Sequence, residues 1–325
     1  MILPRLTSWP VRTAEHVDLW LHAFALLSTD STMLPLFAPR YRDSLTVVKN
    51  RAAIFTALDS NHLALSRGLS TRGGYLRAQL LPLEFTSWEV FRRQAELFLN
   101  ANSATRSSFS AAFPAATDRD WLRAFLDGVQ SEQQKFYAED YSRVLRGRAR
   151  ILSAVDSLWT GVYRRKFERF LTRTEQGTGD LVLALPIAAA GRVGVGRDRH
   201  LAIVVPFPAR LDDVHSVLFV FAHEVTGSTA AAVVADIATA VERRNGVADR
   251  YVSMGQVRAG EQLISAVAPE LSDEYMRYYL MQSGVTSANS MPISRLRDAF
   301  TMRFTLPSEI RDALAMQLES VLRGN

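Results

Sequence analysis

The segment VLFVFAHEVTGS, residues 217–228, places His223 and Glu224 side by side within an otherwise apolar run. Burying a charged or polar side chain without a partner costs on the order of several kcal/mol, so the pair is expected to have stabilising contacts. Ionisable residues also occur elsewhere in the run from 214 to 241, which argues against a membrane-spanning helix. At about 100° per residue, His223 shares its helical face with small and apolar side chains. The segment therefore predicts a buried core helix that carries an imidazole.

Length and composition limit the class of protein. The chain has 325 residues, 48% of them hydrophobic, which is enough for one large domain or two ordinary ones. It contains no cysteine, which excludes disulfides, thiolate catalysis and cysteine-bound metals and leaves His, Asp and Glu as possible metal ligands. The start, MILPRLTSWPVRT, lacks the charged head and apolar centre of a signal peptide. As printed, the protein is expected in the cytoplasm, or outside it if a leader has been removed.

The charge distribution does not favour a nucleic-acid partner. The net charge of +5 is mild for this length, and the strong preference for arginine over lysine is typical of a GC-rich bacterial genome. The densest basic cluster, YRRKFERF at residues 163–170, interleaves aromatic and basic side chains, a pattern that can follow a phosphate backbone. An amphipathic helix with solvated arginines is the better interpretation, because charge runs usually form solvated faces.

The first half of the chain has helical periodicity. A capping-box pattern of Thr86 and Glu89, with Phe85 expected to pack onto Val90, marks one helix start. The spacing of apolar residues predicts further helices over residues 13–28, from Thr117 onward and over residues 149–173.

The character of the sequence changes at TEQGTGD, residues 174–180, where glycines and small polar residues end the helical pattern. The apolar runs at 181–190 and 200–208 predict a hairpin or two neighbouring strands, joined by a plain turn in GRVGVGRDR. Helices are expected near 256–267, 273–282, 293–302 and 308–322. We therefore predict a mainly helical α+β fold, with a helical domain over 1–175 and a second domain over 176–325 that holds the strands and the His-Glu helix.

The order of strands, a His-Glu helix and a later helix with Glu261 beside Gly260 suggests a metal site. In an H-E-x-x-H helix, two imidazoles one turn apart bind zinc, the glutamate activates a water, and a later helix supplies a third ligand. Over about 181–270 the chain resembles the zincin metallopeptidases, specifically the gluzincin group, whose third ligand is a glutamate. The resemblance implies His223 and Glu261 as zinc ligands, Glu224 as catalytic general base, and a peptide or protein substrate.

The sequence departs from this motif at Gly227, which stands where the second histidine is expected. Three explanations remain open: the scaffold has lost its metal, another residue replaces the ligand, or the likeness is accidental. We expect the space beside Gly227 to be filled by His16, Asp18 or His22 from the N-terminal half, or by ordered water. We also expect the carboxylate of Glu261 to lie close enough to the His223 ring to share a metal or a water.

Three functions are compatible with the sequence. The first is a zinc-dependent, peptidase-like hydrolase with an incomplete ligand set, in which Glu224 polarises a zinc-bound water. The second is a non-catalytic binding or scaffolding protein on a zincin-like fold, with His223 and Glu224 kept as a hydrogen-bonded core pair, and Gly227 favours it. The third is an arginine-mediated nucleic-acid binder, which steep salt dependence of binding would reveal. Serine catalysis is not expected, because no G-x-S-x-G turn is present.

Overall fold

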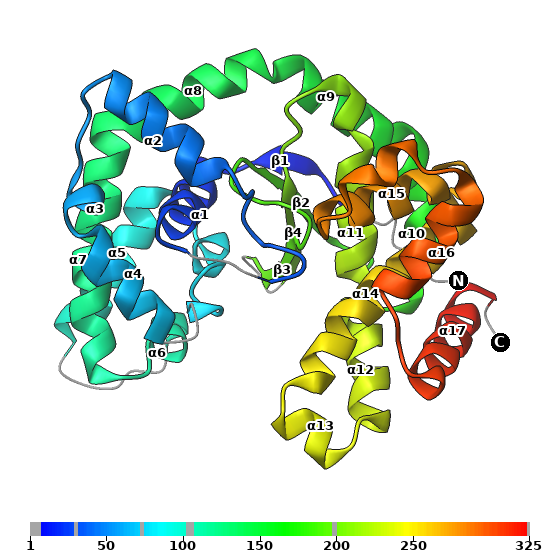
Figure 1. Ribbon diagram of the computed structural model, residues 1–325. Coiled ribbons are helices and arrows are strands. Elements are labelled where there is room, and N and C mark those ends of the chain that lie inside the picture. Colours follow the sequence, from blue (N-terminus) through cyan, green and yellow to red (C-terminus); the bar gives the residue numbers. More distant parts are fainter. Residues whose placement is uncertain (1–7, 29–31, 72–74, 102–106, 197–199, 324–325) are drawn as a thin grey trace, which may run out of the picture.

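The computed structural model describes residues 8–28, 32–71, 75–101, 107–196 and 200–323, and its helices form two lobes on either side of a small sheet (Figure 1). The predicted α+β class, mainly helical, is confirmed. Four strands form the sheet: β1 (Val11–Thr13), β2 (Gly179–Ala184), β3 (Arg192–Val195) and β4 (Leu201–Pro206).

The sheet has the order β1-β2-β4-β3. Strands β1, β2 and β4 run parallel, with Val11 opposite Leu181 and Leu181 opposite Ile203. The two predicted strands are therefore neighbours, but they are parallel. The expectation of a plain turn between them is wrong over residues 192–195, which form β3 antiparallel to β4; residues 197–199 lie outside the described residues.

Side chains of the central strands alternate between two hydrophobic cores. Leu181, Leu183 and Ile203 join the core of the C-terminal lobe, whereas Val182 and Val204 join that of the N-terminal lobe. Because both faces are covered, these strands appear in the sequence as continuous apolar runs instead of alternating ones. The division predicted near residue 175 stays a prediction, since the two cores share one sheet.

The N-terminal lobe is helical, as its periodicity predicts. Its α5 helix begins one residue later than the capping-box pattern indicates: Ser87, not Thr86, accepts a hydrogen bond from the Val90 amide. Phe85 packs on Phe91, and its expected contact with Val90 stays a prediction. The helices of this lobe are α1 (Glu15–Leu27), α2 (Tyr41–Arg51), α3 (Ala57–Ser60), α4 (His62–Thr71), η2 (Leu81–Glu84), α5 (Trp88–Asn100), α6 (Ser108–Ala112), α7 (Ala116–Glu132), η3 (Gln133–Tyr137) and α8 (Ala138–Gly147).

The C-terminal lobe packs its helices on the opposite face of the sheet (Figure 1). Its helices are α9 (Ala149–Leu158), η4 (Trp159–Tyr163), α10 (Arg164–Arg173), η6 (Leu211–Asp213), α11 (His215–Val225), α12 (Gly227–Ile237), α13 (Ala240–Arg244), α14 (Val247–Val267), η7 (Pro269–Leu271), α15 (Ser272–Gln282), η8 (Thr286–Ser290), α16 (Ile293–Arg303) and α17 (Ser308–Arg323). The basic cluster at 163–170 is amphipathic: Phe167 and Phe170 are buried, and Lys166 pairs with Glu270.

The segment that carries His223 is a buried helix, as predicted, but it is interrupted. Helix α11 ends and α12 begins around Thr226, whose hydroxyl donates to the carbonyls of Ala222 and His223. Such back-bonding competes with the helical hydrogen-bond ladder and often bends helices. The stretch Leu211–Ile237 is long and apolar enough to cross a membrane by length and composition, yet 72% of its most apolar window is buried inside the fold, as in a core helix.

Candidate functional site

His223 and Glu224 form a buried pair at the end of α11. The side chains are 4% and 7% exposed, and Nδ1 of His223 lies 2.8 Å from Oε1 of Glu224. Because a carboxylate only accepts hydrogen bonds, Nδ1 of His223 is the donor in this contact. Nε2 is buried and has no hydrogen-bond partner among the described residues. The ring stacks on Tyr279 of α15, with centroids 5.4 Å apart.

The space beside Gly227 is filled by a residue of the same lobe. A β-carbon at this position would lie 2.5 Å from Nε2 of Gln256, which comes from α14. The expectation that a side chain from the N-terminal half or water fills this space is therefore wrong. The side chains of His16, Asp18 and His22 bind other partners in their own lobe.

The carboxylate of Glu261 accepts hydrogen bonds from two serine hydroxyls of the C-terminal lobe. Its Oε1 accepts hydrogen bonds from Ser265 at 2.8 Å and Ser272 at 3.3 Å. The neighbouring Gly260 brings α14 against α11, because a β-carbon there would lie 3.2 Å from the backbone nitrogen of His223. The backbone of α14 therefore comes close to that of α11 beside His223. The expected closeness of the Glu261 carboxylate to the His223 ring stays a prediction, and Oε1 of Glu261 bonds to the two serines.

A zinc site requires at least three protein ligands in most catalytic centres. Among the residues that the structure describes, no three His, Cys, Asp or Glu side chains come together in a metal-binding group. Among the described residues, Nε2 of His223 has no hydrogen-bond partner and is one possible metal ligand. At Gly227, where the second histidine of the motif is expected, the space is taken by Gln256, and the carboxylate of Glu261 is hydrogen-bonded to serine. The residues present do not fit a three-ligand zinc ion.

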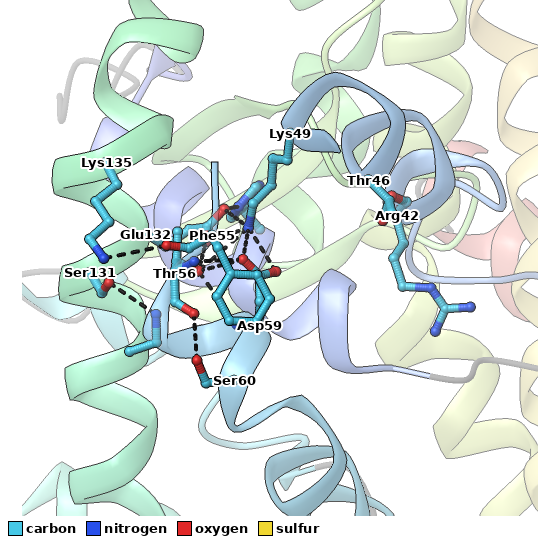
Figure 2. A network of polar contacts seen from close by, with 12 residues as sticks. Arg42, Thr46, Lys49, Phe55, Thr56, Asp59, Ser60, Ser131, Glu132 and Lys135 are labelled. Carbon is cyan, nitrogen blue, oxygen red and sulfur yellow. Dashed lines mark hydrogen bonds and ion pairs between the residues drawn. The ribbon is translucent and has the colours of Figure 1, made fainter. Parts of the chain in front are cut away.

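A separate polar network lies in the N-terminal lobe (Figure 2). Nζ of Lys49 lies 2.8 Å from Oε2 of Glu132 and 2.8 Å from Oδ1 of Asp59, and the hydroxyl of Thr56 donates to Glu132 at 2.6 Å. These residues come from α2, α3 and α7 and their connections, so the network joins three parts of the lobe.

His22 completes this network. Its Nε2 lies 3.2 Å from Oε1 of Glu132, and its Nδ1 lies 2.9 Å from the hydroxyl of Tyr41. Burial by itself raises the pKa of Glu132, but hydrogen bonds from His22, Lys49 and Thr56 outweigh it and lower the pKa to about 2. Glu132 is therefore a fully ionised, fully paired buried carboxylate with a structural role.

A large cavity lies between the two lobes at the carboxyl ends of β2 and β4. Its volume is about 950 Å³, and Leu185 and Phe207, which follow these strands, line it together with residues of α2, α8 and α15. Ligands of proteins with parallel strands bind preferentially in such a crevice. Neither His223 nor Glu224 is among the lining residues.

Asp18 bonds to the backbone of Leu185, a residue that lines this cavity. Its Oδ2 accepts a hydrogen bond from the backbone amide of Leu185 at 2.7 Å, and its Oδ1 accepts one from Tyr137 at 2.7 Å. Burial raises the pKa of Asp18 to about 7, although these two hydrogen bonds oppose the shift. From the sequence, Asp18 is expected only as a candidate to fill the space beside Gly227, and no local pattern indicates its contact with Leu185.

Comparisons of the chain with family models, with curated proteins and with solved structures give no match. The assignment of a function therefore depends on the geometry of the His223–Glu224 pair and of the cavity between the lobes.

Proposed function

We propose that this protein is a non-catalytic binding protein on a zincin-like scaffold without a complete metal site, and that its ligand occupies the cavity between the lobes. The observation that carries the proposal is the cavity itself, about 950 Å³ in volume and placed at the carboxyl ends of parallel strands. A mainly apolar pocket of this size with a few polar groups is the usual form of a small-molecule site.

The geometry of the His-Glu helix supports the same proposal. His223 and Glu224 bond to each other, and Glu261 bonds to serines, as expected for groups retained in a core. The likeness to the zincins depends on the order of elements, in which the strands precede the His-Glu helix and α14 then crosses it at Gly260.

Binding of a neutral apolar dye, N-phenyl-1-naphthylamine, tests the proposal. We expect saturable binding at one site, read from dye fluorescence. Tryptophans placed on opposite walls by Ser44→Trp and Gln282→Trp should together weaken binding at least tenfold, because both positions line the cavity. Thr46→Trp is the matched control, since Thr46 is exposed on the same helix as Ser44 and does not line the cavity. Dye binding that the double variant leaves unchanged would rule out this cavity.

A zinc-dependent hydrolase remains the second candidate, and one observation favours it: Nε2 of His223 is buried, has no hydrogen-bond partner in the part of the chain that the structure describes, and is a possible metal ligand. Elemental analysis of protein purified without chelator or added metal tests it. We expect no stoichiometric zinc. Near-stoichiometric zinc that is lost in His223→Ala would support the hydrolase and contradict the binding proposal.

A further inference from the structure

We infer that the cavity binds an organic carboxylate with an apolar body, and that Arg148 binds the carboxylate group. This inference rests on the proposed binding function and names the chemical class of its ligand. It is carried by the fixed position of one guanidinium, by the pairing of the other charges around it and by the apolar walls.

Arg148 lies between α8 and α9, where the chain passes from one lobe to the other, and it lines the cavity. Its Nη1 donates to the carbonyls of Phe207 at 2.5 Å and Pro208 at 3.3 Å, and the guanidinium stands over the Phe207 ring at 5.4 Å. These contacts hold the group in one orientation.

The opposite edge of the Arg148 guanidinium is available to a ligand. Nε and Nη2 share this edge, and neither forms a hydrogen bond to any residue in the described part of the chain. Two parallel N–H donors on one edge match the two oxygens of a carboxylate. Since the anchoring contacts use only Nη1, a ligand can bind without displacing them.

Most other charges that line the cavity already have partners. Arg143 pairs with Asp140, and Arg277 donates to three backbone carbonyls. On the opposite wall, Asp213 pairs with Arg210 and Glu274 pairs with His215. Asp213 and Glu274 on that wall therefore already have partners.

The side chains of two lining residues, Arg40 and Asp212, form no hydrogen bond or ion pair with another described residue. Arg40 precedes α2 in the N-terminal lobe, which also carries Arg143, and Asp212 lies in η6 of the C-terminal lobe. Asp18, below Leu185, attracts Arg148 electrostatically, but burial raises the pKa of Asp18 to about 7, so it carries only part of a negative charge near neutral pH. The charges near Arg148 therefore favour an anion.

The remaining walls favour an apolar body attached to that anion. Leucine, valine, isoleucine and methionine side chains dominate them: Leu45, Val48, Val144, Leu185, Ile187 and Met281. A small hydrophilic carboxylate would leave these surfaces in contact with water. Each CH₂ group that an alkyl chain buries against them strengthens binding about fourfold.

Displacement of N-phenyl-1-naphthylamine by decanoate and by 1-decanol tests the inference. The wild-type protein should bind decanoate at least tenfold more tightly than decanol. Arg148→Gln should remove this preference and leave decanol binding unchanged, because glutamine is uncharged and presents no paired edge to a carboxylate. Arg148→Lys, which keeps the charge without the paired edge, should give an intermediate preference. Arg146→Gln, at an exposed position two residues earlier, should behave as wild type.

The outcomes separate the two proposals. Equal affinity for acid and alcohol in the wild type, or an unchanged preference in Arg148→Gln, overturns the carboxylate inference while dye binding still supports the cavity as a binding site. Dye that binds but is displaced by neither compound also overturns the inference. Absence of dye binding contradicts the proposed function itself. If Arg148→Gln fails to fold, the wild-type comparison and Arg148→Lys decide the question.

Discussion

A buried histidine-glutamate pair lies in each lobe, and these two pairs of described residues differ in how completely their polar atoms have hydrogen-bond partners. In the N-terminal lobe, both ring nitrogens of His22 have hydrogen-bond partners, and Glu132 also accepts hydrogen bonds from Lys49 and Thr56. In the C-terminal lobe, His223 and Glu224 share one hydrogen bond, and Nε2 of His223 has no partner among the described residues.

The comparison shows that the same two residue types can be held in place by different forces. The first pair brings together residues 110 positions apart and is closed by opposite charges. The second consists of neighbours on one helix and is held by packing against Tyr279 and by the close approach of α14 at Gly260. Breaking the first should therefore expose unpaired charge, whereas breaking the second should mainly disturb packing.

The largest effect is expected for Glu132→Ala. This change leaves the buried Lys49 with the partly exposed Asp59 and without its buried carboxylate partner, and removal of one member of a buried ion pair costs about 3–5 kcal/mol. Glu224→Ala is the matched change in the second pair, where loss of one hydrogen bond should cost about 1–2 kcal/mol. Chemical denaturation of both variants measures the difference. Equal losses would mean that the two pairs are held in the same way.

Gly260→Ala should destabilise the protein by about 1–3 kcal/mol, because the new methyl group would press on the buried Tyr275 hydroxyl and the His223 backbone. The matched control is Gly255→Ala on the same helix, where the new atom meets Ala230 at 3.4 Å, an ordinary contact. Alanine there should be neutral or stabilise by up to about 1 kcal/mol. Thermal unfolding of the two variants gives the comparison; similar stabilities would argue against packing as the force that holds the second pair.

A third buried carboxyl, Asp18, has no ion-pair partner like that of Glu132 and should respond to pH in the opposite sense. Its pKa rises from 3.8 to about 7 on folding, so the stability it contributes is full below pH 3.8 and is lost as pH rises through about 7. Asn cannot ionise and can still accept from the Leu185 amide. Asp18→Asn should therefore exceed wild-type stability at pH 8 by on the order of 1–3 kcal/mol, with a smaller advantage at pH 5.

Urea unfolding at pH 5 and pH 8 measures this effect for Asp18→Asn. Glu132 does not interfere, because its pKa of about 2 means that its contribution is lost only as pH falls below about 4.5. A wild-type protein that gains stability relative to Asp18→Asn as pH rises from 5 to 8 would contradict the assignment.

The smallest effect is expected for Gly227→His, which restores the missing residue of the zincin motif. The new side chain crowds the end of Gln256, which is flexible, so the cost should be about 1 kcal/mol, at the low end for overpacking. Isothermal titration should detect no zinc binding. Zinc affinity in Gly227→His combined with Gln256→Ala would show that the second pair keeps the spacing of a metal site.

Local pattern was sufficient for much of the fold. The helix predicted over 273–282 is observed at Ser272–Gln282, and that predicted over 308–322 at Ser308–Arg323. The burial of His223 and Glu224 followed from their apolar neighbours. These features depend on residues within a few turns of each other, so periodicity along the chain contains the information.

Only the tertiary structure decided how these elements meet. β1 has three residues and gains its hydrogen bonds from β2, about 170 positions later, so no local pattern reveals it. In the same way Gln256 fills the space beside Gly227, and Arg148 is anchored by carbonyls about 60 positions away. The sequence by itself predicted several of the helices, the apolar strands β2 and β4, and the buried His-Glu pair. The partners of its polar groups and the cavity depend on contacts between distant segments, because their energies arise only when folding brings those segments together.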